Sequence, residues 1–105
     1  VAPCAGVEPA FHIYPLHAEA RDSLLGYLRA AGIDAKVHYP TPLHLQPAAS
    51  SLGYKSGDFP VAEWCAGNTL SLPVHEFLTE ADIDFMARSV REGMEAGLPA
   101  AAYDR

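Results

Sequence analysis

The 105-residue chain has few of the features that mark secreted, membrane-spanning or nucleic-acid-binding proteins. It has only two cysteines, Cys4 and Cys65, without C-x-x-C spacing, and small secreted domains normally carry more. Seven Lys and Arg residues against thirteen Asp and Glu residues leave a net charge of −6, which disfavours non-specific binding to DNA or RNA. The apolar runs are too short for a membrane-spanning helix. We therefore expect a cytoplasmic protein with reduced thiols that binds neither nucleic acid nor membrane.

The beginning of the chain lacks the signals of a secreted protein. It starts at Val1 rather than at Met, and no charged segment with a following apolar run opens it, so no signal peptide is expected. Residues 1–10 contain small residues and two prolines and predict a linker. We expect the chain to be a fragment or a processed product that contains one domain with a modest core.

Hydrophobic periodicity predicts an α/β fold, namely an α+β two-layer sandwich. The expected strands are 11–16, 33–39 and 69–72, and the expected helices are 18–31, 60–67 and 80–96. The element order is then β-α-β-loop-α-β-α, with about three strands in one small sheet and the helices packed on it. Residues 40–50 carry three prolines and are expected to form no regular element. The tail after the domain is expected at 99–105.

Local signals place the ends of the expected helices. Gly32 suits the left-handed position after the first helix, and Pro60 suits the first turn of the second. Thr79 followed by Asp82 predicts a capping box for the third helix. The expected apolar face of that helix consists of Ile83, Met86, Val90 and Met94.

The sequence has no recognisable catalytic or metal-binding motif. The five histidines lack the paired spacing of zinc sites, so no metal site is expected. The serines and cysteines have no nucleophile motif, and no Gly-rich loop is present to bind phosphate. Of the only two lysines, Lys36 reads as a solvated side chain on a strand and Lys55 lies in a loop. We therefore predict no catalytic residue in this chain.

One segment, residues 36–47, combines polar side chains with a backbone that prolines stiffen. Its polar groups are His38, Tyr39, His44 and Gln46. Imidazole and phenol groups donate to phosphate oxygens, and a carboxamide pairs with hydroxyls, so this set suits a polar, anionic or sugar-like ligand. In the alternative interpretation the prolines only shape a turn, while Tyr39 and Leu45 fill the core. The residue chemistry leaves both interpretations open.

The order of several motifs resembles a known family. The motifs are FHIYPL (11–16), HYPTPLHLQP (38–47), LGYKSGDFPVAE (52–63) and LSLPVHEFLTEADIDF (70–85). Together they resemble the C-terminal segment of the DegT/StrS-type sugar aminotransferases. Those are enzymes of the aspartate-aminotransferase fold that use pyridoxal 5'-phosphate (PLP) and act on nucleotide-linked keto-sugars. The resemblance covers about residues 11–95, with order and spacing kept.

The resemblance implies that residues 11–98 are the small C-terminal domain of such an aminotransferase. The Schiff-base lysine and the phosphate-binding residues would then belong to an upstream PLP-binding domain, and this chain alone would hold no cofactor. The family also implies a homo-oligomer with sites at the subunit interface. Carried over by position, His38 and Tyr39 would contact the nucleotide-sugar, with His44 and Gln46 as weaker candidates. Asp58 would cap the helix that begins at Pro60.

Two other functions remain open at this point. A PLP-type sugar dehydratase replaces the Schiff-base lysine, and that position lies outside this sequence. A stand-alone module that binds a nucleotide-sugar or a protein without catalysis would need no lysine upstream. In either case a small domain separated from its partner would expose apolar side chains, so we expect this chain to associate with itself or with another polypeptide.

Overall fold

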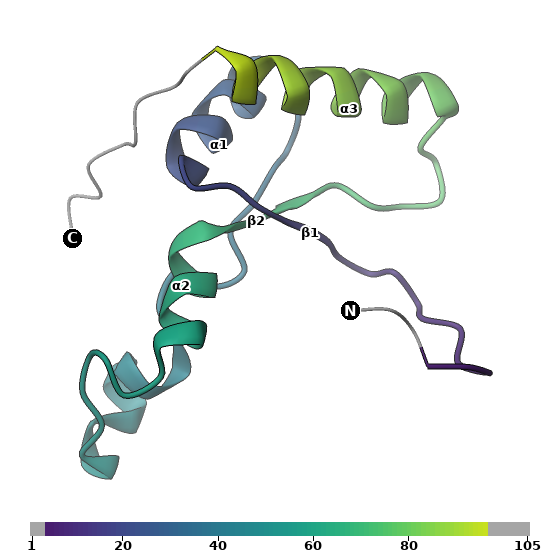
Figure 1. The fold of residues 1–105 in the computed structure, drawn as a ribbon. Coiled ribbons are helices and arrows are strands. Elements are labelled where there is room, and N and C mark those ends of the chain that lie inside the picture. Colours follow the sequence, from purple (N-terminus) through teal and green to yellow (C-terminus); the bar gives the residue numbers. More distant parts are fainter. Residues whose placement is uncertain (1–3, 97–105) are drawn as a thin grey trace.

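The computed structural model describes residues 4–96 and contains three α-helices and a two-stranded antiparallel sheet (Figure 1). The elements in order are β1 (Tyr14–His17), α1 (Arg21–Ala30), the short 3₁₀ helices η1 (Leu43–Leu45) and η2 (Pro47–Leu52), α2 (Pro60–Asn68), β2 (Thr69–Leu72) and α3 (Glu80–Glu95). The fold is mixed α/β, as predicted. Within residues 4–96 no helix is long and apolar enough to cross a membrane. The predicted tail, 99–105, lies outside the described residues.

The two strands pair with Pro15 of β1 opposite Ser71 of β2. Proline has no N–H to donate to a sheet, so its place in a strand has to be one where no donor is needed. Such a place exists here because the N–H and C=O of Ser71 point away from β1 and bond to Lys36, at 2.7 and 3.0 Å. β1 is thus an edge strand of the sheet, where a proline is tolerated.

The prediction of a third strand at 33–39 is wrong. The backbone of this segment pairs with the sheet at one bridge only, between Lys36 and Ser71. Before the bridge the chain turns tightly, with the Ala35 N–H donating to the Ile33 carbonyl at 2.8 Å. After it Pro40, which has no N–H, leads the chain away from the sheet. The alternating pattern therefore reflects burial of Ile33 and Ala35 beside a single bridge, not a strand.

Two other boundaries differ from the prediction. β1 begins at Tyr14 rather than at 11, because Phe11 has a φ of 47° and cannot extend the strand. Residues 40–50, expected to be irregular, contain η1 and most of η2. Proline favours these 3₁₀ turns because its fixed φ suits their first positions, and Pro47 is the first residue of η2.

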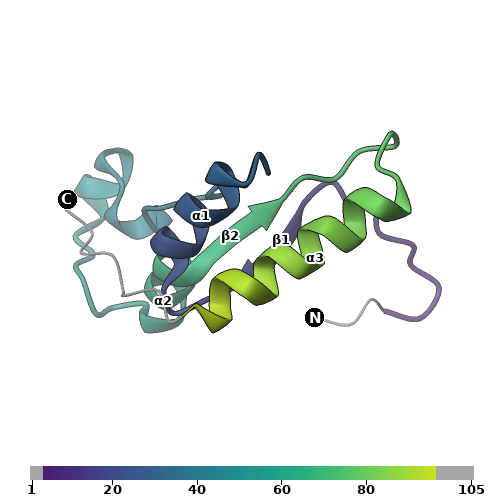
Figure 2. The same ribbon diagram turned by 90° about the horizontal axis from the view of Figure 1, so that it is seen from above.

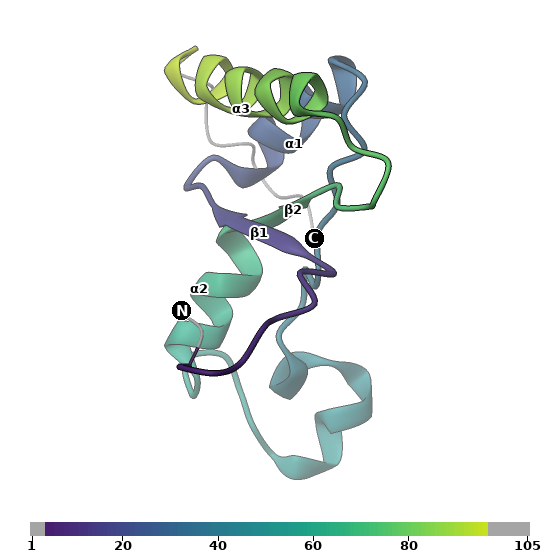
Figure 3. The same cartoon turned by 90° about the vertical axis from the view of Figure 1, so that its right-hand side faces the viewer.

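The core lies between the sheet and the pair α1 and α3, which Figure 3 shows on the same side of the strands. Its largest fully buried side chains are Leu24, Leu28 and Leu70. Leu24 and Leu28 are one helical turn apart on α1 and therefore lie on the same face of the helix. Figure 2 shows α3 running alongside the strands, so that one helix covers most of the sheet's length.

α3 begins with the predicted capping box. The Thr79 hydroxyl accepts from the Asp82 N–H at 3.2 Å, and the Asp82 carboxylate accepts from the Thr79 N–H at 2.9 Å. Its predicted apolar face is only half correct, because Met86 and Val90 pack on the core whereas Ile83 and Met94 are exposed. The ten-residue helix α1 is shorter than the sixteen-residue α3 and does not cover both of its ends.

α2 and the segment 40–59 lie on the other side of the sheet from α1 and α3 (Figures 1 and 3). Arg21, at the start of α1, joins the two sides. Its guanidinium is buried and donates to the carbonyls of Ala66 and Thr69 at 3.2 and 3.1 Å. The radius of gyration is 15.9 Å, whereas a compact domain of about 100 residues has about 13 Å. The molecule is therefore less compact than an ordinary domain of its length.

Candidate functional site

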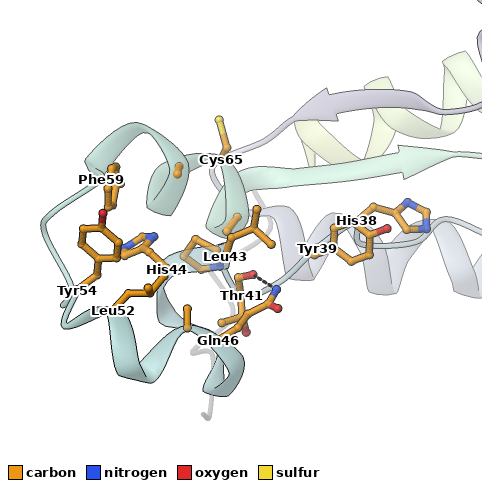
Figure 4. Close-up of a pocket in the computed structure, with 14 residues that line it drawn as sticks. His38, Tyr39, Thr41, Leu43, His44, Gln46, Leu52, Tyr54, Phe59 and Cys65 are labelled. Atoms are coloured by element: carbon orange, nitrogen blue, oxygen red, sulfur yellow. Dashed lines mark hydrogen bonds between the residues drawn. The ribbon is translucent and has the colours of Figure 1, made fainter.

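An open pocket of about 550 Å³ lies between α2 and the segment that precedes it (Figure 4). Its walls are mainly apolar. All four side chains that the sequence pointed to line it, namely His38, Tyr39, His44 and Gln46. Figure 4 shows that they do not converge on one point: His38 and Tyr39 lie at one end, while His44 lies at the other beside Tyr54 and Phe59.

His44 is held by the protein itself. Its side chain is only 7% exposed, and its Nε2 lies 3.1 Å from Oε1 of Glu63. Because an ionised carboxylate can only accept, Nε2 is the nitrogen that carries the proton. The ring also packs on Phe59 with centroids 4.8 Å apart, and Phe59 in turn contacts Tyr54 edge-on at 5.1 Å. These three rings form one end of the pocket.

Glu63, on α2, collects four hydrogen bonds. Besides His44, its carboxylate accepts from the Gly57 N–H at 2.8 Å, the Ser56 hydroxyl at 3.0 Å and the Phe59 N–H at 3.4 Å. The bond from Gly57 is the main cause that lowers the pKa of Glu63, and the bonds from Ser56, His44 and Phe59 add to it against the opposing effect of burial. Glu63 is thus held as an anion at the start of α2.

The side-chain amide of Gln46 also makes a hydrogen bond within the protein. Its Nε2 donates to the Thr41 carbonyl at 3.2 Å, the contact drawn as a dashed line in Figure 4. This bond closes the Pro-rich turn that leads into η1 and η2. Together with the His44 bond it explains why the pocket is mainly apolar although polar side chains line it.

His38 and Tyr39 keep polar groups free for a ligand. His38 uses Nδ1 to bond Ser71 Oγ on β2 at 3.2 Å, and its other ring nitrogen makes no hydrogen bond within residues 4–96. Tyr39 is 71% exposed, and its hydroxyl makes none within the same residues. Tyr39 and Leu45 are both exposed, so the interpretation in which they fill the core is wrong.

Sequence reasoning missed Glu63 and misplaced Asp58. Asp58 does not cap α2: its carboxylate accepts from the Lys55 N–H at 2.9 Å, and no side-chain cap bonds the first residues of the helix. The N–H groups before α2 are bound instead by Glu63, from within the helix. A glutamate three residues after the helix-starting Pro60 is the signal that points to this arrangement.

Both lysines of the chain lie away from this pocket. The Lys36 ammonium pairs with the Asp34 carboxylate at 2.9 Å on the open surface, and Lys55 is exposed in the turn before α2. Neither lysine lines the pocket. Within residues 4–96, no three His, Cys, Asp or Glu side chains come together as metal ligands would.

The comparisons with known proteins decide the family. The model of the DegT/DnrJ/EryC1/StrS aminotransferase family matches residues 5–91. The chain belongs to this family. The match includes every residue that lines the pocket. The chain spans only about a quarter of the length of the DegT/DnrJ/EryC1/StrS relatives that it matches.

Two relatives illustrate the range of the family. The erythromycin biosynthesis sensory transduction protein EryC1 of Saccharopolyspora erythraea is 42% identical over 86 residues, which are 82% of this chain and 24% of that protein. A dTDP-3-amino-3,4,6-trideoxy-alpha-D-glucose transaminase of Streptomyces venezuelae is 38% identical over 88 residues, 84% of this chain and 23% of that protein.

Solved structures of the family share the fold. The crystal structure of S. venezuelae DesV in complex with a ketimine intermediate superposes with a TM-score of 0.79 at 38% identity, over 84% of this chain and 24% of that one. A DegT DnrJ EryC1 StrS aminotransferase from Brucella abortus gives a TM-score of 0.76 at 37% identity, over 89% of this chain and 25% of that one. A Streptococcus pneumoniae protein described as a sugar aminotransferase in its PMP form gives 0.73 at 29% identity, over 83% and 23%. The family is PLP-dependent.

Proposed function

We propose that residues 11–98 are the small C-terminal domain of a PLP-dependent aminotransferase that acts on a nucleotide-linked keto-sugar. The observation that carries this proposal is the family match over residues 5–91 together with the transaminase activity on a dTDP-sugar that the name of a 38% identical relative states. The cofactor supplies the amino-group chemistry when it is bound. Its lysine belongs to an upstream domain, because neither lysine of this chain lines the pocket.

In this proposal the present chain binds and orients the sugar-nucleotide. His38 and Tyr39 contact the polar part of the substrate, because their ring nitrogen and hydroxyl make no hydrogen bond within residues 4–96 and both side chains lie at one end of the pocket (Figure 4). His44 and Gln46 line the site, with their polar atoms bonded to the protein. The apolar walls between these residues exclude water from the bound group.

The extended shape supports a partner domain. A radius of gyration of 15.9 Å and exposed large apolar side chains such as Leu43, Val61 and Phe77 are features of a body that packs against another one. In this proposal the upstream PLP-binding domain covers these exposed apolar side chains. The whole protein is a homo-oligomer in the cytoplasm.

The test is amino-group transfer by the whole polypeptide that carries this sequence. The protein is loaded with PLP and mixed with L-glutamate and a dTDP- or UDP-linked keto-sugar, and the sugar product is analysed by mass spectrometry. The proposal predicts a product in which an amino group replaces the keto oxygen. Loss of water from the sugar instead would identify a dehydratase, and no cofactor uptake with retained sugar-nucleotide binding would identify a binding module.

A further inference from the structure

Glu63 connects two parts of the pocket wall that are far apart in the sequence. Its carboxylate accepts hydrogen bonds from His44 of η1, nineteen residues away, and from Ser56 and Gly57 in the turn before α2. Its side chain is 21% exposed, so these bonds are made in a partly dehydrated place where they are stronger than in water. One carboxylate on a rigid helix therefore holds both segments.

The turn at 53–59 has little else to hold it in place. Its own bonds join Lys55 and Asp58 to each other, at 2.9 and 3.2 Å. Every residue from 51 to 60 is exposed, so burial contributes little to its position. One backbone bond ties the turn to α2, from the Glu63 N–H to the Phe59 carbonyl at 3.0 Å. The side-chain bonds described between the turn and α2 all end on the Glu63 carboxylate.

We propose that Glu63 is the positioning residue of this pocket, which holds the 53–59 turn and the ring of His44 against α2 in the shape that receives the sugar-nucleotide. The aromatic end of the pocket follows directly, because Tyr54 and Phe59 belong to this turn and Phe59 packs on His44. The inference rests on the proposed function for the identity of the ligand only.

A glutamine in place of Glu63 separates this role from mere space filling. It has nearly the same shape, but one of its two terminal groups is an NH₂ that donates. Oε1 accepts three of the four bonds and Oε2 accepts the Ser56 hydroxyl. A glutamine with its oxygen at Oε1 can still accept those three, and its NH₂ can donate to the Ser56 hydroxyl oxygen, so the substitution keeps the geometry and removes the charge that strengthens these bonds. We expect Glu63→Gln to release the turn while the helices and the sheet stay intact.

Trypsin cleavage measures how readily the turn opens, because Lys55 is the only Lys or Arg between Lys36 and Arg88. Cleavage after a lysine requires local opening of the chain. In the whole polypeptide, we expect Glu63→Gln to speed cleavage after Lys55 by about tenfold, because hydrogen bonds to a neutral amide are weaker than those to a carboxylate. Cleavage after Arg88, within α3, serves as the internal reference and stays unchanged. Glu95→Gln, an exposed glutamate of α3, is the matched control and changes neither rate.

Two results overturn the positioning role. One is unchanged cleavage after Lys55 in Glu63→Gln. The other is an equal acceleration after Lys55 and Arg88, because that indicates a general loss of stability rather than release of the turn. If Glu63→Gln fails to fold, Ser56→Ala is used instead, because it removes a single hydrogen-bond donor to Glu63. Faster cleavage after Lys55, with unchanged cleavage after Arg88, then supports the positioning role. Unchanged cleavage at both sites contradicts it.

The ligand part is tested by isothermal titration with dTDP-glucose and UDP-glucose. For whichever binds the wild-type polypeptide more tightly, we expect Glu63→Gln to weaken binding at least several-fold and Glu95→Gln to leave it unchanged. If Glu63→Gln speeds cleavage after Lys55 but binds the sugar-nucleotide as tightly as wild type, the turn does not shape the site. That result would contradict the proposal. If the wild-type protein binds neither probe, the proposed function fails, and the trypsin rates still decide the positioning role.

Discussion

Gly93 of α3 lies so close to Leu24 of α1 that a Cβ on Gly93 would stand 2.7 Å from Leu24 Cδ1. The Tyr27 ring would be 2.9 Å from the same Cβ. Leu24 is buried in the core, so its methyl group has no free space to move into. The contact between the two helices thus depends on a residue without a side chain.

We predict that Gly93→Ala destabilises the fold although alanine is the better helix former. Overpacking a closed core costs about 1–3 kcal/mol, and the gain in helix propensity of about 1 kcal/mol offsets only part of it. Gly26→Ala on α1 is the matched control, because nothing lies within 4 Å of its Cβ and alanine is expected to stabilise there. Urea unfolding of both variants checks this; equal or greater stability of Gly93→Ala than wild type would contradict the close packing.

Thr79→Ala is expected to lower the free energy of unfolding by about 1 kcal/mol, because it leaves the Asp82 N–H without its side-chain partner. Thr79→Ser keeps the hydroxyl and should retain most of the stability. Thermal unfolding monitored by circular dichroism compares the two. If alanine and serine behave alike, the capping box contributes nothing.

Local signals in the sequence predict the three helices, and the strand pattern predicts both strands of the sheet, β2 with its exact bounds, but it also predicts a third strand that does not form. Pro60, Thr79 and Gly32 act within one turn of the chain, and the structure confirms the first two as helix starts and gives Gly32 a φ of 84°. Whether 33–39 becomes a strand depends instead on its partner in space, and only Lys36 finds one. Periodicity records which side chains are buried, not how many backbone bonds are made.

The site shows the same division. Clustering of polar groups on a Pro-rich stretch predicts that His38 and Tyr39 contact a polar ligand. The structure places both residues in the lining of one pocket, and the contact itself stays a prediction. The sequence could not predict which polar groups are already bonded within the protein. His44 and the turn at 53–59 bond to Glu63 on α2. Glu63 satisfies them from a position that reads in the sequence as an ordinary helix carboxylate.

Acid should weaken the part of the fold that Glu63 holds. The bond from the Gly57 N–H, with those from Ser56 and His44, keeps the pKa of Glu63 below its ordinary value of 4.5. A group whose pKa is lower in the folded state stabilises the fold fully above its unfolded pKa, and that contribution is lost as the pH falls through the folded value.

We therefore expect wild type to lose more stability than Glu63→Gln between neutral pH and pH values below 4.5. The Asp82 carboxylate also titrates in this range, because the Thr79 hydroxyl lowers its pKa from 3.8, but Asp82 is present in both proteins. Urea unfolding across this range gives the difference between them. A difference that does not shrink in acid would mean that the carboxylate's charge is not what stabilises the turn.

Residues 1–105 on their own are expected to self-associate. Exposed large apolar side chains such as Leu43, Val61 and Phe77 have no partner in an isolated chain. Sedimentation velocity over a range of concentrations checks this, and a monomer at the highest concentration would contradict it.

The most direct measurement is isothermal titration of dTDP-glucose and UDP-glucose into the whole polypeptide, for wild type, His38→Ala and Tyr39→Phe. Both residues keep a polar group free at one end of the pocket, so each variant should weaken binding by about 1 kcal/mol or more, at least fivefold. Arg88 is an exposed residue of α3 that does not line the pocket, so Arg88→Gln should bind the ligand as wild type does. Wild-type affinity in both site variants would contradict the claim that this chain supplies the substrate contacts.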